Sequence, residues 1–133
     1  MISAQSPLLG SSGLDTPIAW RQGRPVSRMV FLRHVARVVR HLPSARFILN
    51  LCEERYHFMV AFAAVGVNGQ TNLLPSSRAS LHLQRLAVDF SDSSRITDSD
   101  LESWLDRGAT EDTADSIPNV PSEQIMAIVL TSG

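Results

Sequence analysis

Residues 46–75 read RFILNLCEERYHFMVAFAAVGVNGQTNLLP and decide the fold, because they encode a strand, a helix and a second strand in succession. Arg46–Leu51 is a short apolar run typical of a buried parallel strand. Residues 53–67 are apolar on nearly every side after a first turn that holds two glutamates, which predicts a well-covered helix. Asn68-Gly69 supplies its C-terminal stop, and Gln70–Leu74 predicts the second strand. This βαβ pattern indicates a parallel sheet.

The segments before this unit predict an arm, a hairpin and a helix. Residues 1–16 hold Ser, Gly and Pro with little periodicity and are expected to form a flexible N-terminal arm. Residues 17–21 and 24–27 predict a short hairpin, and Ser27 is a suitable N-cap for the helix that follows. That helix has an apolar stripe of helical period and ends at Pro43.

The segments after this unit repeat the alternation of helix and strand. Residues 80–90 predict a helix, 94–97 a short strand and 98–106 an acidic helix. Residues 98–123 as a whole form an acidic connector, which includes an expected exposed loop at 107–122, before a final strand that begins at about Gln124. The predicted fold class is therefore α/β, with a mostly parallel sheet and flanking helices over residues 17–133.

Composition narrows the class of protein. A chain of 133 residues with 44% hydrophobic content is about one domain in size, and its net charge of −1 gives no reason to expect nucleic acid as a partner. No apolar run reaches the roughly 18 residues needed to span a bilayer. The single cysteine, Cys52, excludes an internal disulfide and fits a reducing cytoplasm. All 12 basic residues are arginine, so no lysine of this chain can bind a phosphate or form a Schiff base.

Side chains that often carry catalysis are present without a supporting pattern. Cys52 and His57 lie close in sequence, but the neighbouring Glu53 and Glu54 would raise the cysteine pKa, which favours a structural role. Asp98, Asp100 and Glu102 alternate without the further ligands of a calcium loop. The histidines show no metal-ligand spacing; they are His34, His41, His57 and His82. We therefore expect neither catalytic nor metal-binding residues in this chain.

The tail of the chain carries the remaining candidate site. Residues 123–133 read EQIMAIVLTSG, an apolar strand that runs directly into Thr131, Ser132 and Gly133. A strand that opens into a small, hydroxyl-rich turn containing glycine is how many folds begin a phosphate-binding loop, since its exposed N–H groups can face an anion. The three residues are the predicted nucleotide-binding residues. The loop would need residues beyond Gly133, so we expect the chain to be the front part of a larger enzyme.

The order of these elements resembles the N-terminal region of the adenylate-forming (AMP-binding) enzymes, the superfamily of acyl- and aryl-CoA synthetases, luciferases and peptide-synthetase adenylation domains. The resemblance covers residues 17–133. It lies in the hairpin and helix, the run from Phe47 to Pro75, the helix and strand that follow, the acidic connector and the terminal Ile128-Val-Leu-Thr-Ser-Gly133. In the family this last strand usually continues as T-S-G followed by S/T-T-G, so the chain stops within the motif. The central run is most similar to members that activate fatty or aromatic acids.

The resemblance implies an ATP-dependent ligase. A carboxylic acid would be adenylated with release of pyrophosphate and then transferred to the thiol of CoA or of a carrier protein. ATP and magnesium would be required in the full-length enzyme, and none is expected to bind this fragment. Thr131, Ser132 and Gly133 would begin the loop around the pyrophosphate end of ATP. The acyl pocket, magnesium ligand and adenylating lysine of the family lie further along the chain, so this chain is expected to be a scaffold, inactive alone, whose partner is the remainder of the synthetase.

Two other interpretations stay open. A free-standing α/β interaction module would use an exposed apolar edge or face to form a homo-oligomer. A small flavodoxin-like or receiver-like domain would bind magnesium or a phosphoryl group at acids that follow its strands. Asp98 and Asp100 follow only one predicted strand, so this last interpretation is the least favoured.

Overall fold

The computed structural model describes residues 5–10, 13, 15–106, 118–121 and 123–130. The strands are β1 (Gln5–Pro7), β2 (Pro17–Arg21), β3 (Arg24–Ser27), β4 (Phe47–Asn50), β5 (Thr71–Leu74), β6 (Ser93–Ile96), β7 (Asn119–Pro121) and β8 (Ala127–Val129). The helices are α1 (Arg28–His41), α2 (Arg55–Val67), α3 (Ser80–Asp89) and α4 (Asp98–Asp106). The alternation of strand and helix expected from the sequence is confirmed, with boundaries that differ by up to three residues.

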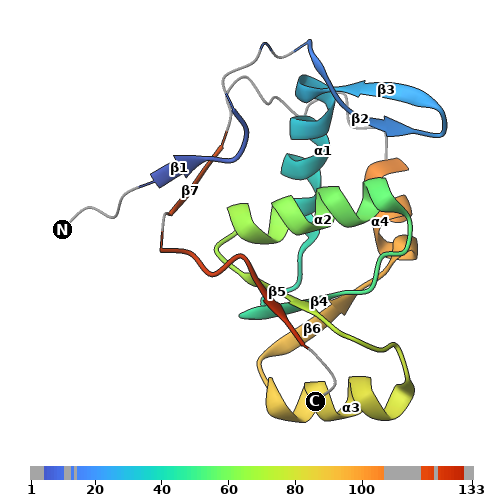
Figure 1. The fold of residues 1–133 in the computed structure, drawn as a ribbon, viewed down its shortest axis with the longest axis vertical. Coiled ribbons are helices and arrows are strands. Elements are labelled where there is room, and N and C mark those ends of the chain that lie inside the picture. Colours follow the sequence, from blue (N-terminus) through green and yellow to red (C-terminus); the bar gives the residue numbers. More distant parts are fainter. Residues whose placement is uncertain (1–4, 11–12, 14, 107–117, 122, 131–133) are drawn as a thin grey trace.

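A four-stranded parallel sheet with the order β6-β4-β5-β8 forms the centre of the molecule (Figure 1). The expected class, α/β with a parallel sheet and flanking helices, is confirmed. The final strand was expected to begin at about Gln124, but its ladder with β5 spans only Ala127–Val129. β8 is nevertheless parallel to β5 and lies at the edge of the sheet.

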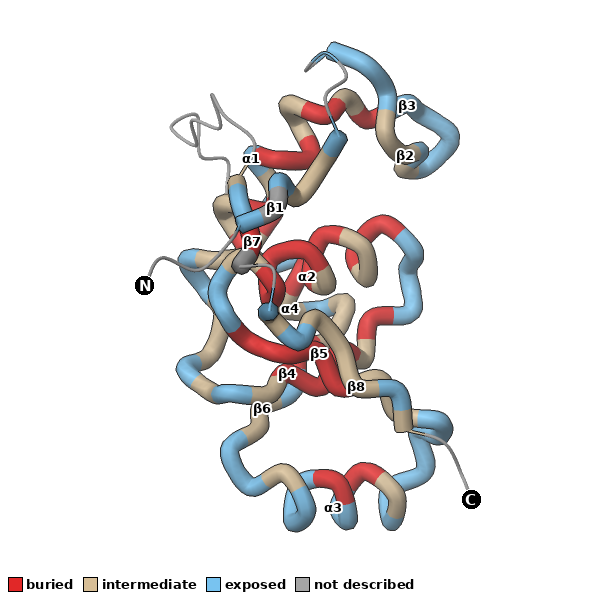
Figure 2. The backbone as a smooth tube through the Cα atoms, turned by 60° about the vertical axis from the view of Figure 1, so that its left-hand side comes forward, coloured by how far each residue is buried: buried red, intermediate tan, exposed pale blue. Residues whose placement is uncertain are grey.

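Helices cover both faces of this sheet (Figures 1 and 2). On one face, α1, α2 and α4 enclose the larger core, and Ile48 of β4 and Ile96 of β6 point into it. On the other face, α3 is the one helix among the described residues, and its Leu83 and Leu86 contact Leu49 and Leu73 of the sheet. Because both faces are covered, the central strands are apolar on both sides, as parallel strands usually are.

Local signals fix the ends of α1 and α2. The Ser27 hydroxyl accepts a hydrogen bond from the Val30 N–H at 3.2 Å, so the expected N-cap is confirmed. Glu53 and Glu54 were expected inside the first turn of α2, but the helix begins at Arg55 and Glu54 is its N-cap. α2 ends before Gly69, whose φ of +77° is a conformation that side chains other than glycine rarely adopt.

Two antiparallel strand pairs lie outside the central sheet. β2 and β3 form the expected hairpin. β1 pairs with β7, so Gln5–Pro7 of the expected flexible arm lies against Asn119–Pro121 of the expected loop. This second pair was not predicted, because its strands are three residues long and widely separated in sequence. No helix in the described part of the chain combines the length and apolar content that crossing a bilayer requires.

Candidate functional site

The carboxyl ends of the four parallel strands meet at one edge of the sheet, and the described part of the candidate site lies there. The chain leaves β4 toward α2 on one face and leaves β5 toward α3 on the opposite face (Figure 1). In open α/β sheets the crevice between two such diverging connections is the usual place for a ligand. The strand order therefore singles out the carboxyl ends of β4 and β5 as the expected position for a ligand.

Arg78 lies between the chain segments that follow β4 and β5, and the sequence analysis did not identify it. Its guanidinium donates to the Leu51 carbonyl at 2.7 Å and to the Cys52 carbonyl at 3.4 Å. It also lies 3.9 Å from the Glu53 carboxylate. The side chain therefore ties the end of β4 to the loop after β5 and places a positive charge at the carboxyl edge of the sheet.

The predicted nucleotide-binding residues Thr131, Ser132 and Gly133 lie outside the described residues. The described strand reaches Leu130, whose N–H donates to the Leu74 carbonyl at 3.0 Å. Ladder contact with β5 therefore continues one residue beyond β8. β8 thus brings the chain to the carboxyl edge immediately before Thr131.

The outer side of β8 is open in the described part of the chain. Met126 accepts a hydrogen bond from Asn72 and Leu130 donates one to Leu74, so even-numbered residues of this strand face β5. Because strand residues alternate, the N–H and C=O groups of Ala127 and Val129 point away from β5. Apart from β5, no described strand pairs with β8, and Val129 is 68% exposed.

At the same edge of the sheet, the end of β4 and the end of β6 are joined by Asp98. Its carboxylate accepts hydrogen bonds from the Glu53 N–H at 2.8 Å and the Glu54 N–H at 3.2 Å. It also pairs with Nδ1 of the buried His57 at 2.9 Å. Burial alone would raise the pKa of Asp98, but the bonds from Glu53, His57 and Glu54 together outweigh burial, and the pKa is lowered. The side chain is therefore held as a carboxylate that connects α2 and α4.

His57 and Asp98 were both considered in the sequence analysis, but never together. The signal that unites them is topological, because β4 and β6 are adjacent parallel strands and their following loops must lie side by side. Asp100, in contrast, caps its own helix by accepting bonds from the Thr97 N–H and hydroxyl. Within the described residues, no three His, Cys, Asp or Glu side chains are placed to hold one metal ion.

The surroundings of Cys52 favour a structural role. It is buried, and its N–H donates to the Asn50 side chain at 3.2 Å. Burial, followed by the negative charges of Asp98 and Asp100, raises the pKa of the Cys52 thiol to about 12. The thiol is therefore protonated at neutral pH and a poor nucleophile, in agreement with the structural role expected from the sequence.

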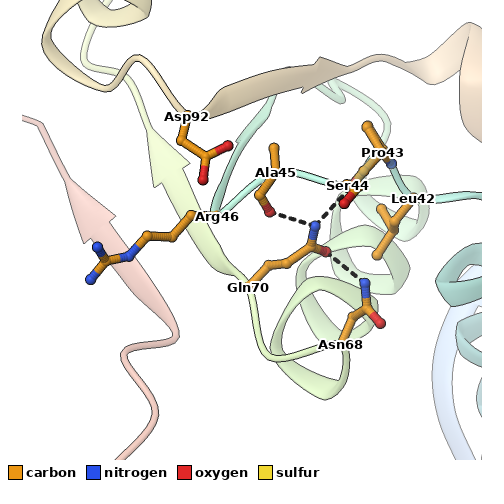
Figure 3. A pocket seen from close by; sticks show the side chains of 8 residues that line it. All are labelled: Leu42, Pro43, Ser44, Ala45, Arg46, Asn68, Gln70 and Asp92. Atoms are coloured by element: carbon orange, nitrogen blue, oxygen red, sulfur yellow. Dashed lines mark hydrogen bonds between the residues drawn. The ribbon is translucent and has the colours of Figure 1, made fainter.

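A hollow of about 370 Å³ lies at the opposite, amino edge of the sheet (Figure 3). Gln70 stands at its centre, where its amide donates to the Pro43 and Ala45 carbonyls and accepts from the Asn68 side chain. Figure 3 shows the Arg46 guanidinium pointing away from this amide. The contacts of Gln70 fasten the start of β4 to the turn after α2, so this hollow is explained by the packing of the fold.

The chain matches no protein-family model, no curated protein and no solved structure.

Proposed function

We propose that this chain is the N-terminal scaffold of an ATP-dependent ligase that adenylates a fatty or aromatic carboxylic acid and transfers it to the thiol of CoA or of a carrier protein. The observation that carries the proposal is the placement of β8. It is a parallel edge strand whose ladder contacts extend to Leu130, and its next residues are Thr131, Ser132 and Gly133. A loop at this position would start at the sheet edge where α/β folds bind nucleotides.

The chemistry assigned to the complete enzyme has two steps. A carboxylate oxygen attacks the α-phosphorus of ATP, pyrophosphate leaves, and an acyl-adenylate forms. A thiol then attacks the acyl carbon, a thioester forms, and AMP leaves. The role proposed for this chain is to hold the first part of the phosphate loop, whose hydroxyl and N–H groups would donate to the pyrophosphate oxygens.

Magnesium would neutralise charge on the phosphates in such an enzyme. The described residues of this chain offer no site for magnesium, since no three carboxylate, thiol or imidazole groups among them lie close enough together to hold one ion. The proposal therefore assigns the magnesium ligands, the acyl pocket and the adenylating lysine to the remainder of the synthetase. The open side of β8 supports this division, because further strands could pair with Ala127 and Val129.

The coding sequence that follows the codon for Gly133 tests the proposal directly. We expect Ser/Thr-Thr-Gly in frame, followed by several hundred codons. The 133-residue chain alone should show no ATP–pyrophosphate exchange with a panel of carboxylic acids, whereas the longer product should exchange. In the longer product, Ser132→Ala should reduce exchange by about tenfold to a hundredfold, by analogy with the loss of one donor to a charged transition state. A stop codon after Gly133, or a longer product without exchange, would refute the proposal.

A free-standing interaction module is the second candidate, and the exposed edge of the sheet is the observation that favours it. Ile125 is 60% exposed and Val129 is 68% exposed, beside backbone groups of β8 that pair with no other described strand. A module of this kind would dimerise through β8, and Val129→Lys would convert the dimer to a monomer. Light scattering coupled to size exclusion separates the cases, because a chain that is monomeric at all concentrations contradicts the module.

A further inference from the structure

A hollow of about 550 Å³ lies beside the first turns of α3, the helix that follows β5 (Figure 1). Its described walls are Ala79, Leu81, His82 and Arg85. The volume lies in the range that small organic ligands occupy in proteins. α3 begins after the carboxyl end of β5, which is one of the two strand ends where the strand order places a ligand.

One wall of the hollow contains a buried nitrogen that has no partner. Nε2 of His82 is buried, and no described group forms a hydrogen bond with it. Buried polar atoms are usually hydrogen-bonded, and one that is left without a partner is unfavourable. Because no described residue bonds to this imidazole, its tautomer is not fixed, and Nε2 can carry a proton. The ring is therefore able to donate to a ligand in the hollow.

Three backbone donors lie at the same end of α3. The N-cap, Ala79, has no side-chain oxygen, and none of the described groups accepts from the N–H groups of Ser80, Leu81 or His82. The N–H groups in the first turn of an α-helix all point beyond its N-terminus, so these three donors converge through the geometry of the helix. The positive end of the helix dipole strengthens their attraction for an anion.

Arg85 adds a full positive charge to these donors. It follows Leu81 by four residues and His82 by three, so the three side chains share one side of the helix. Long side chains on a helix lean toward its N-terminus, which brings the guanidinium over the first turn. Among the described residues, no carboxylate pairs with Arg85. Asp89, the single acid of α3, is exposed and is not among the described walls of the hollow.

We propose that this hollow binds the phosphate group of a small organic phosphate. The oxygens of a phosphate accept hydrogen bonds and carry negative charge, which matches the backbone N–H groups, the imidazole and the guanidinium. Exposed Ala79 and Leu81 offer apolar surface to the organic part. A metal ion suits the hollow less well, because its described walls hold a guanidinium and no carboxylate. The proposal does not depend on the ligase function, since Thr131, Ser132 and Gly133 take no part in it.

An NMR titration of the 133-residue chain with phenyl phosphate tests the proposal, at constant ionic strength and with phenol as the probe that lacks the phosphate. Phenyl phosphate should bind saturably, and phenol should not. The backbone amide signals of the first turn of α3 and the ring nitrogen signals of His82 should move. The ring signals of the other three histidines should not move, because α1 and α2, which carry them, lie on the opposite face of the sheet.

Three variants divide the site into its parts. Arg85→Gln should weaken binding by about twofold to fivefold, since this arginine is exposed. His82→Phe keeps an aromatic ring without the nitrogen and should weaken binding by about fivefold to tenfold. Ser80→Pro removes one N–H at the first helical position, where proline is tolerated because Ala79 has a ψ of 138°, and should weaken binding by about twofold to fivefold. Arg33→Gln makes the same charge change at an exposed position of α1, and this matched control should bind as the wild type does.

Ser132→Ala separates this hollow from the predicted phosphate loop, and it should leave the binding of phenyl phosphate unchanged. Loss of binding in Ser132→Ala, with full binding in Arg85→Gln, would place the phosphate at the loop and overturn the proposal. Absence of saturable binding, unmoved His82 signals, an equal loss in Arg33→Gln or equal binding of phenol would overturn it as well.

Discussion

Replacement of Asp98 by Asn should loosen the connection between α2 and α4. The wild-type carboxylate accepts from two backbone N–H groups, those of Glu53 and Glu54, and pairs with His57 Nδ1. Asparagine keeps the shape but has one acceptor oxygen in place of two, and its NH₂ would face N–H donors. At least one of the three contacts is therefore lost, and the remaining ones lose their charge.

The size of the effect follows from the exposure of these groups. A hydrogen bond to a charged group contributes about 1.5–3 kcal/mol when well shielded. The Asp98 side chain is 30% exposed and the two backbone contacts lie at the surface, so the lower end applies. We expect Asp98→Asn to reduce the free energy of unfolding by about 1.5–2 kcal/mol at neutral pH. With a urea m-value of about 2 kcal/mol/M, the midpoint falls by about 1 M.

The stability difference between wild type and Asp98→Asn should also depend on pH. The pKa of Asp98 is lowered in the folded state, so the stability from its charge is fully present above the unfolded pKa of about 3.9. That stability is lost as pH falls through the folded pKa. Urea titrations from neutral to acidic pH should therefore show a difference between wild type and Asp98→Asn that is constant at neutral pH and shrinks below about pH 4. Asp89→Asn should match the wild type throughout. A difference below about 0.5 kcal/mol at neutral pH, or one unchanged by acid, would refute the reasoning.

Three further predictions concern the core and the helix ends. Cys52, buried and with a raised pKa, should react with Ellman's reagent at least about 100-fold more slowly in the native chain than in urea; equal rates would contradict its placement. Ser27→Ala should destabilise the fold by about 1 kcal/mol in urea titration, because the Val30 N–H loses its cap, and Ser27→Asp should restore most of this loss. Leu101→Ala should reduce the free energy of unfolding by about 2–5 kcal/mol, because Leu101 is fully buried. Val88→Ala, at a 77% exposed position, is the control and should change the free energy of unfolding by no more than about 0.5 kcal/mol. Similar values for the two variants would show that α4 does not pack as described.

The parts of the fold that depend on local signals were predictable. Pro43 and Gly69 mark where α1 and α2 must end. The apolar run Arg46–Leu51, which lies between the two helices, has the length of a buried strand. The N-cap of α1 was found because Ser27 precedes an apolar stripe. The start of α2 was expected at Glu53, two residues before the observed start at Arg55, because two adjacent glutamates suit both an N-cap and a first turn.

The parts that depend on distant contacts were missed. Gln5–Pro7 has no apolar alternation, and its partner Asn119–Pro121 lies within an acidic, proline-containing segment that favours a loop. The His57–Asp98 pair required the strand order, which places β6 next to β4 although β5 comes between them in sequence. Arg78 was missed for the same reason, since its partners are backbone carbonyls of another strand's loop, which no side-chain pattern reveals.

The pairing of β1 with β7 has a consequence for the order in which the molecule is assembled. During synthesis, Gln5–Pro7 leaves the ribosome long before Asn119–Pro121 has been made. The first segment therefore stays exposed to solvent while the helices and strands between the two segments fold. Pairing β1 with β7 closes a loop of more than a hundred residues, which has a large entropic cost. Contacts between segments that are close in sequence do not have this cost, so folding can begin there. This short ribbon should therefore form last during synthesis and be the first contact to fray on warming.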